Sequence, residues 1–309
     1  MEANWEWYRS FLSVIETGSL SAAARALGLA QPTMGRHIEA LEHALGLALF
    51  TRSHDGYAPT DAALQLRPYA ETLAATAAAM QRVASSQGDG VRGTVRVTAS
   101  EIIGVEVLPP ILARLRAACP ELTVELLLSN RIDNLLLREA DIAVRMVRPA
   151  QEALVARRLG AAELGLHAHR AYLDRAGVPK TLAQLSGHSL IGYDRETDFQ
   201  RRLRQPYPFI QRGHFSFRAD SDLAQLAAIR AGFGIGACQV GLAARDPALV
   251  RLLPAAFSLK LDTWLAMHED LRDSPRCAVT YAALGRGLSD YLAGRPPAAA
   301  LVAVPAPRS

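Results

Sequence analysis

The 309-residue chain lacks the features that mark several large classes of protein. It contains no run of ~18 or more apolar residues, the length that a membrane-spanning helix needs. Its start, MEANWEWYRS, is charged and aromatic and has no apolar segment of the kind found in signal peptides. We therefore expect a cytoplasmic protein with no membrane partner. Aromatic residues are few, at 6%, but 50% of the residues are hydrophobic, which favours a globular fold over a disordered chain.

Cysteine is also scarce. Cys119, Cys238 and Cys277 lie far apart in the sequence and form no CxxC pair. The sequence therefore predicts neither a disulfide framework nor a zinc site. Buried, reduced thiols are the preferred interpretation, and a redox switch is the alternative.

Motifs of common enzyme classes are missing as well. There is no P-loop and no GxSxG elbow. Residues 232–236, GFGIG, resemble part of a dinucleotide-binding loop, but they follow a predicted helix and precede a predicted strand, which is the reverse of the required order. His167 and His169 alternate along a predicted strand and could share a metal ion, but no further ligand stands at a suitable spacing. We expect no catalytic site, no cofactor and no metal.

The distribution of charge gives little support for nucleic-acid binding. The formal net charge is +4 and the pI is near 9.1. Residues 1–60, however, carry a net charge of −2, because four basic side chains stand against six acidic ones. The basic residues are Arg9, Arg25, Arg36 and Arg52, and the acidic residues are Glu2, Glu6, Glu16, Glu39, Glu42 and Asp55. Any case for DNA must therefore rest on a motif.

Such a motif stands near the N-terminus. Apolar residues at helical spacing predict a first helix from about residue 4 to Thr17, which Gly18 ends. Ser21 is expected to cap a second helix, AAARAL, that ends at Gly28. After a short turn, Pro32 fits the first turn of a third helix. Two short helices joined by a tight turn are the arrangement that lays a helix in the major groove of DNA.

The third helix is predicted to have two faces. An apolar stripe faces inward and consists of Ile38, Leu41, Leu45 and Leu49. The opposite face is mostly polar and consists of Gln31, Thr33, Met34, Arg36 and His37. Near a helix N-terminus, Gln can bind adenine and Arg can bind guanine. A solvated helix face is the alternative, but the helix-turn-helix spacing favours DNA.

A hairpin and a long helix follow. Asp55-Gly56 is predicted to form the turn of a DNA-binding wing, with Arg52 at its base reaching a phosphate or making only local contacts. Residues 60–86 then predict a helix, kinked near Pro68, with an apolar seam at spacings of three and four. The seam consists of Leu66, Tyr69, Leu73, Thr76, Met80 and Val83. It is expected to pair two subunits, and packing onto the chain's own first helix is the alternative.

Residues 91–293 alternate strands and helices, as α/β layers do. The pattern predicts two lobes joined by two crossovers: lobe I at about 91–161 and 266–293, and lobe II at about 162–265. A cleft between such lobes can close on a small molecule. The tail from residue 294 is rich in proline and alanine and is expected to be disordered.

The segment GSLSAAARALGLAQPTMGRHIEALEHALGLALFTR and the PTDAA after it resemble the winged helix-turn-helix of LysR-type transcriptional regulators. The order of elements in the two lobes and HEDLRDSPR near the end extend the resemblance to essentially the whole chain. Three departures stand out. Ala30 replaces a usual Ser or Thr, Gly35 replaces a common Ser, and Asp55 falls where many members carry an Arg.

The fold class implied is an N-terminal all-α winged helix-turn-helix followed by a two-lobed, periplasmic-binding-protein-like α/β effector domain. The domain limits expected are 1–60 for DNA binding, 61–87 for the linker helix and 88–293 for the effector domain. The partners implied are a double-stranded DNA operator, further copies of the chain in a dimer or tetramer, a small-molecule effector, and RNA polymerase if the protein is an activator. The DNA-binding residues expected are Ser21, Gln31, Pro32, Thr33, Arg36, His37 and Arg52.

Ligands of α/β sheets lie at the carboxyl ends of strands and at helix N-termini. Those points are Ser100, Glu101, Ser129, Asn130, Arg145, His167, Asp220 and Ser221, and the resemblance also favours all of them except His167. For each serine, a helix cap is the alternative, and for Arg145 it is a salt bridge between the lobes. Two other functions compete with an effector-controlled transcription factor: a solute-binding protein that delivers a ligand, and an enzyme on the same fold.

Overall fold

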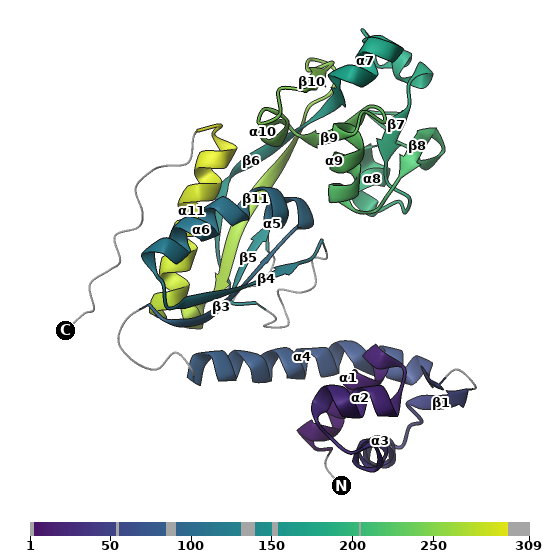
Figure 1. The fold of residues 1–309 in the computed structure, drawn as a ribbon, viewed down its shortest axis with the longest axis vertical. Helices are drawn as coiled ribbons and strands as arrows, with labels where there is room; N and C mark the ends of the chain where they lie inside the picture. Colours follow the sequence, from purple (N-terminus) through teal and green to yellow (C-terminus); the bar gives the residue numbers. More distant parts are fainter. Residues whose placement is uncertain are drawn as a thin grey trace, which may run out of the picture. The chain divides into compact units, whose positions relative to one another are not determined.

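A computed structural model of the chain describes residues 3–53, 56–84, 91–130, 140–149, 154–203 and 205–295. These residues form two compact units, one that ends with the long helix α4 and one that begins after it (Figure 1). Among the described residues, no helix is both long enough and apolar enough to cross a bilayer.

Three short helices build the core of the first unit. They are α1 (Trp5–Thr17), α2 (Leu20–Leu27) and α3 (Gln31–Leu45). The predicted stops at Gly18 and Gly28 are confirmed, because both glycines adopt the left-handed conformation that closes a helix. The predicted cap of α2 is wrong. Ser19 caps this helix by accepting from the amide of Ala22, and Ser21 is its second residue.

The inward face of α3 holds one residue that the sequence pattern placed outside. Met34 is completely buried, beside Ile38 and Leu41 and against Phe11 and Val14 of α1. A flexible, unbranched thioether fills such a core position well. Leu49 is buried as predicted, but it lies beyond the end of α3 rather than on the helix.

The hairpin forms as predicted, from β1 (Phe50–Ser53) and β2 (Gly56–Pro59). Its register pairs Ser53 with Gly56. The predicted turn at Asp55-Gly56 is therefore shifted, since Gly56 belongs to β2, and Asp55 lies outside the described residues. The Glu42 carboxylate of α3 accepts from the amides of Leu49 and Phe50, at 2.7 and 3.2 Å, and so fixes the start of the hairpin.

The predicted linker helix is α4 (Asp61–Ala84). Tyr69, Leu73 and Met80 of the predicted seam are exposed, by 73%, 46% and 69%. Leu66 instead packs against the core of the first unit, so at this position the alternative of packing within the chain holds. The hydroxyl of Thr76, which is half-buried, donates to the carbonyl of Thr72. The side chain of Val83 lies outside the described residues, and the kink near Pro68 stays a prediction.

The second unit is built on one sheet, with seven strands among the described residues. Strands β3 (Gly93–Ala99), β4 (Leu122–Leu128) and β5 (Ile142–Arg145) are parallel neighbours at one end. Two long antiparallel strands, β6 (Leu154–His169) and β11 (Leu259–His268), run from lobe I into lobe II. The two connections between the lobes that the sequence predicted are therefore each made by a continuous strand.

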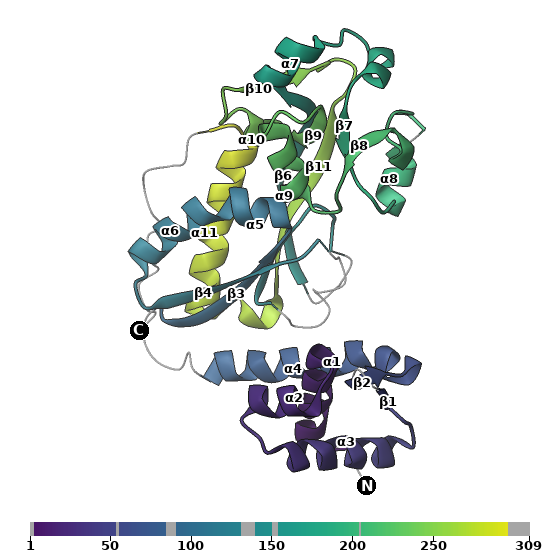
Figure 2. The same cartoon turned by 45° about the vertical axis from the view of Figure 1, so that its right-hand side comes forward.

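Lobe II gathers around the second half of β6. Two short strands, β9 (Gly236–Gln239) and β10 (Leu249–Leu252), pair with β6, and the small sheet of β7 (Leu190–Gly192) and β8 (Phe215–Arg218) lies beside them (Figure 2). Its helices are α7 (Arg170–Ala176), α8 (Asp198–Leu203), α9 (Asp222–Arg230) and α10 (Val240–Ala243). Their apolar centre contains Leu185, Ile235 and Phe257.

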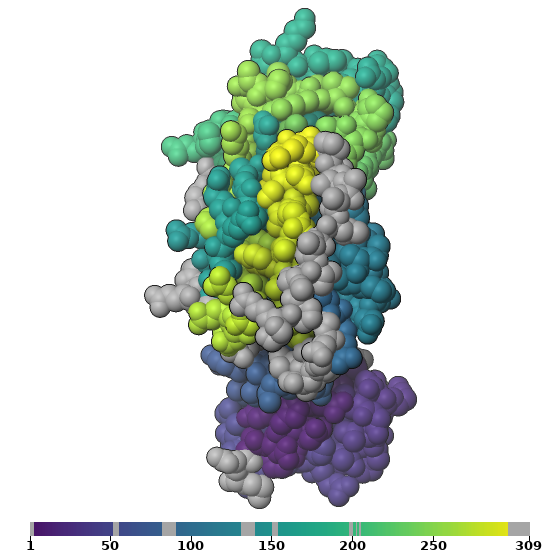
Figure 3. Space-filling view, turned by 90° about the vertical axis from the view of Figure 1, so that its left-hand side faces the viewer, coloured from purple at the N-terminus to yellow at the C-terminus, as the bar shows by residue number. Residues whose placement is uncertain are grey.

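The described part of lobe I contains three helices: α5 (Glu101–Glu106), α6 (Leu108–Ala118) and α11 (Pro275–Leu292). Helix α11 packs beside α6 and against the sheet, and its outer side forms part of the surface of the unit (Figure 3). One apolar cluster includes Ile103 and Leu108 of lobe I together with Leu226 and Ile229 of lobe II. The two lobes therefore share a continuous core on this side.

The sequence pattern missed some elements. Helix α5 and strand β10 were not predicted, because six and four residues are too few for a clear periodicity. The segments SLKLD and TWLAMH form the single strand β11 rather than a strand and a crossover. The helix predicted at 131–139 lies outside the described residues, as does the tail from residue 296 on.

Candidate nucleic-acid interface and effector site

The N-terminal turns of α3 present the residues expected to read DNA. Gln31, Pro32 and Arg36 are exposed, and Thr33 is half-buried. Among the described residues, Arg36 forms no ion pair and no side-chain hydrogen bond, although Glu39 follows one turn later on the same helix. A guanidinium with five unused donors on an exposed helix face is suited to a bidentate contact with an external acceptor.

The N-terminus of α3 also has no side-chain cap and no nearby acidic residue on the helix. Ala30 precedes the helix and has no side-chain acceptor, and no acidic residue stands in the first turn. The positive end of the helix dipole is therefore not neutralised by the chain itself. An anion such as a phosphate would be stabilised at this end.

Three other residues were predicted to contact DNA, and one of them, His37, contacts another helix of the chain. His37 is half-buried, and its Nδ1 lies 2.8 Å from the Oγ of the buried Ser10. One ring nitrogen of His37 therefore holds α3 on α1, which corrects its assignment to the outward face. Ser21 is half-buried in the first turn of α2. Arg52 lies on β1, and its side chain is outside the described residues.

In lobe I, four predicted effector residues come together at the ends of β3 and β4. Ser100 precedes α5, and its side chain caps no amide. The amide of Glu101 donates to Asn130 Oδ1 at 3.1 Å, and the amide of Ser129 donates to the carbonyl of Ala99 at 2.9 Å. Parallel strands end at the same edge of a sheet, so residues that follow β3 and β4 become neighbours.

In lobe II, Ser221 joins this cluster. Its hydroxyl donates to Glu101 Oε2 at 2.8 Å, and the same Oγ lies 3.5 Å from the amide of Ala224, where it caps α9. Ser221 is thus both the helix cap of the alternative interpretation and a contact between the lobes.

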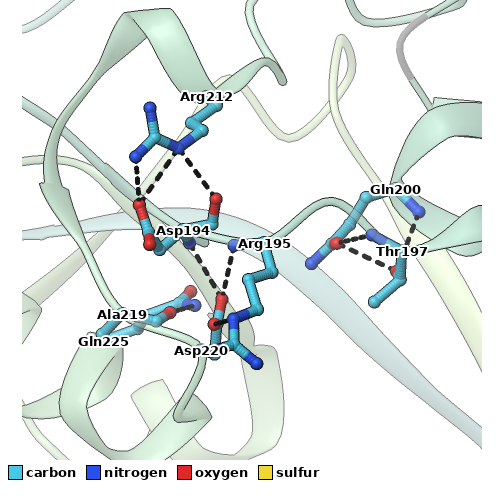
Figure 4. Close-up of polar contacts among 8 residues, drawn as sticks. All are labelled: Asp194, Arg195, Thr197, Gln200, Arg212, Ala219, Asp220 and Gln225. Carbon is cyan, nitrogen blue, oxygen red and sulfur yellow. Dashed lines mark hydrogen bonds and ion pairs between the residues drawn. The ribbon is translucent and has the colours of Figure 1, made fainter.

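Asp220 has a structural role in this geometry (Figure 4). Its Oδ1 accepts from the amides of Asp194 and Arg195, at 2.9 and 2.8 Å, and so holds the turn after β7. Beyond that turn, Arg212 donates to Asp194 Oδ1 at 2.7 Å. Its Oδ2 lies 3.8 Å from Arg195 Nε, so both oxygens of the Asp220 carboxylate are already engaged by the chain.

Arg145 is the last residue of β5, the strand end where the sequence interpretation placed it, and His167 lies two residues before the end of β6; the side chains of both are buried. Arg145 is buried, and its Nη2 donates to Thr98 Oγ1 while its Nη1 donates to the carbonyl of Val144, contacts that lie within lobe I. His167 is 2% exposed, with Nδ1 2.9 Å from the carbonyl of Gly165 and 3.3 Å from Cys238 Sγ. It faces the interior because alternate residues of a strand point to opposite sides.

Burial lowers the pKa of His167 from its ordinary value of 6.5, which favours a neutral ring. His169 does not share a ligand with it, because its Nδ1 accepts from the amide of Ala171 and caps α7. Over the described ranges, no cluster of three histidine, cysteine, aspartate or glutamate side chains could hold a metal ion.

A second contact between the lobes was missed by the sequence interpretation. Glu106, at the end of α5, accepts two hydrogen bonds from Arg230, at 2.6 and 2.9 Å, and its carbonyl accepts from Arg245. The hydrogen bonds from Arg230 hold the pKa of Glu106 below its ordinary value of 4.5. No sequence signal pointed to this pair, because α5 itself was not predicted and the partners stand 124 residues apart.

Both ends of α5 are therefore tied to α9, by Glu101 with Ser221 at one end and by Glu106 with Arg230 at the other. A ligand that competes for Glu101, Ser221 or Asn130 would alter a contact that fixes one lobe against the other. The arrangement offers hydrogen-bond donors and acceptors from both lobes at one place, which is what recognition of a small polar molecule needs.

Family models match both parts of the chain. Residues 5–64 match the model described as "Bacterial regulatory helix-turn-helix protein, lysR family", and residues 88–289 match the "LysR substrate binding domain". The HTH-type transcriptional regulator CrgA of Neisseria meningitidis serogroup C (strain 8013) is 26% identical over 257 residues, which are 82% of this chain and 85% of that protein.

An HTH-type transcriptional regulator of Xanthomonas campestris pv. campestris (strain 8004) is 30% identical over 181 residues, 59% of this chain, and the match spans about half of that protein, 53%. The solved structure of full-length CbnR complexed with its target DNA has the same fold, with a TM-score of 0.63, 21% identity, and coverage of 92% of this chain and 99% of that chain. The matched models cover most of the sequence, and on this basis the chain belongs to the LysR family of transcriptional regulators.

Proposed function

We propose that this LysR-type DNA-binding transcriptional regulator recognises a double-stranded DNA operator through Gln31, Pro32, Thr33 and Arg36 of α3. Ser21 and Arg52 are proposed as further contacts. The observation that carries this proposal is the exposed guanidinium of Arg36, which has no partner among the described residues. The CbnR structure was solved with DNA bound, which is consistent with this use of the fold.

The test is a gel-shift titration of the purified full chain with DNA from upstream of its own gene, at two salt concentrations. We expect a sequence-selective, salt-sensitive shift. Arg36→Ala should lower discrimination between operator and unrelated DNA by ~1–3 kcal/mol if Arg36 contacts a base. Arg170→Ala, an exposed arginine of α7 in the other unit, is the control and should leave the shift unchanged. A uniform loss on all sequences would assign Arg36 to a phosphate instead.

We further propose that α4 pairs two subunits, as a step toward a dimer or tetramer. Tyr69, Leu73 and Met80 expose large apolar surfaces on a helix, and such surfaces favour association in water. Leu73→Asp should reduce the mass measured by light scattering to that of a smaller assembly. Leu64→Asp is the control, because Leu64 is equally exposed, at 50%, but lies on the opposite side of α4. An unchanged mass for Leu73→Asp would contradict the seam.

We propose that the effector is a small molecule and not a permanently bound cofactor. It would bind where Ser100, Glu101, Ser129, Asn130 and Ser221 meet, and would change the contact between the lobes. The domain limits proposed are 1–60, 61–87 and 88–293. RNA polymerase is the further partner if the protein activates transcription.

A screen of metabolites by thermal shift of the full chain tests the effector proposal. A stabilising compound should change the gel shift, and Ser221→Ala should weaken its effect. Turnover of that compound would instead favour an enzyme, and stabilisation without any change in DNA binding would favour a solute-binding protein.

A further inference from the structure

Nothing in the fold of the chain explains why position 35 of α3 is a glycine. It is the fifth residue of α3, half-buried, and its φ lies in the ordinary helical range. A Cβ added at this position would meet only Leu20 Cδ1, at 4.0 Å, which is an ordinary van der Waals distance. Neither backbone conformation nor packing therefore requires glycine.

A glycine in the middle of a helix is unfavourable relative to alanine, because glycine loses more backbone entropy on folding and leaves the helix backbone more exposed to water. By contrast, Gly56 has a φ of +122°, and a Cβ there would lie 2.6 Å from the backbone carbonyl oxygen of Gly18, so at that position the fold itself requires glycine. Any demand for glycine at position 35 must come from a molecule that binds this face.

The surroundings of Gly35 indicate what that molecule presents. Gln31 stands one turn before it and Glu39 one turn after it, and both are exposed. The space that a Cβ would fill is the size of a methyl group, and its inner wall is the apolar end of Leu20. In the major groove, the apolar group of this size is the C5-methyl of thymine.

We infer that Gly35 is a specificity-determining residue for DNA, and that its missing side chain admits the methyl group of one operator thymine against the backbone of α3. This inference rests on the proposed use of α3 for operator recognition. The polar neighbours Gln31 and Arg36 would bind base edges on either side of the same contact.

The test is a double-mutant cycle between protein and DNA, with the full chain and the operator found by gel shift. Gly35→Ala should lower operator affinity about tenfold or more, the range of a mismatched base pair. In a series of probes with single thymine-to-deoxyuridine replacements, one position should weaken the wild type but restore binding to Gly35→Ala. Such non-additivity identifies a direct contact.

Thermal unfolding separates this role from a structural one. Gly35→Ala should raise the midpoint of the first unit by a few degrees, about 2–8 °C, because alanine is the better helix former. Gly213→Ala, where an added Cβ meets nothing within 4 Å, is the control and should leave DNA affinity unchanged.

Three outcomes overturn the inference. Gly35→Ala could bind the operator as tightly as the wild type, no deoxyuridine position could restore its binding, or its midpoint could fall, which would make glycine a requirement of the fold. If the wild type binds no operator, the proposed function fails first; if it binds and Gly35→Ala binds equally, only this inference fails.

Discussion

The ion pair between Glu106 and Arg230 gives a prediction about how the lobes are held. Glu106→Gln removes the negative charge but keeps the shape of the side chain. The Glu106 side chain is 20% exposed and Arg230 is 38% exposed, so solvent screening reduces the interaction but does not abolish it. Charge-assisted hydrogen bonds that are partly buried contribute about 1.5–3 kcal/mol, and with screening we expect a loss of about 1–2 kcal/mol.

The measurement is urea unfolding followed by the fluorescence of Trp264, which lies on β11 in the second unit. The other two tryptophans, Trp5 and Trp7, lie on α1 and are replaced by phenylalanine in every variant compared. Asp262→Asn is the matched control. It removes a 2.7 Å ion pair with Arg158 in which both side chains are about half exposed, so solvent screening leaves the pair little effect on stability.

The pH dependence has a defined sign. Because the pKa of Glu106 is lowered in the folded state, its contribution is fully present above the ordinary value of 4.5 and is lost as the pH falls through the folded pKa. The difference between wild type and Glu106→Gln should therefore shrink below pH 4.5. A Glu106→Gln chain as stable as the wild type at pH 7, or a difference that grows in acid, would refute this account of the lobe contact.

Three further predictions concern single residues. Gly56→Ala should destabilise the first unit by ~1–3 kcal/mol, because φ is +122° and the new Cβ would lie 2.6 Å from a carbonyl oxygen. Glu42→Gln should weaken DNA binding through the wing, since a neutral amide is a poorer acceptor for the two amides at the start of β1. Cys238 should resist iodoacetamide at pH 8 in the native chain, because burial raises its pKa to about 12.

Thermal unfolding, gel shift and mass spectrometry check these three in turn. An unchanged midpoint for Gly56→Ala would contradict the geometry of the hairpin. Full DNA affinity of Glu42→Gln would mean that the wing is fixed by other contacts. Cys238 should react once urea unfolds the chain, which is the control, and equally rapid labelling of the folded chain would contradict its burial.

The first unit could be predicted closely from the sequence because its signals are local. A glycine that follows an apolar stripe, such as Gly18 or Gly28, ends a helix, and a proline such as Pro32 fits the first turn of the next one. The errors were also local in kind. Ser19 and Ser21 are equally good caps by composition, and the choice depended on where the backbone turns. The sequence pattern allows Met34 on either face of α3, and only the packing against α1 decided that its side chain is buried.

In the second unit, the sequence by itself determined the alternation of strands and helices, the two crossovers and the cluster at the strand ends, because each follows from hydrophobic periodicity and from the rule that parallel strands end at one edge. Only the tertiary structure decided that Glu101 meets Ser221, that Glu106 meets Arg230 and that His167 faces the interior. These pairs stand 120 and 124 residues apart, and no local pattern encodes which long side chains meet when two lobes fold together. The physical reason is that contacts at such separations are set by the packing of whole elements and not by the propensities of the residues that make them.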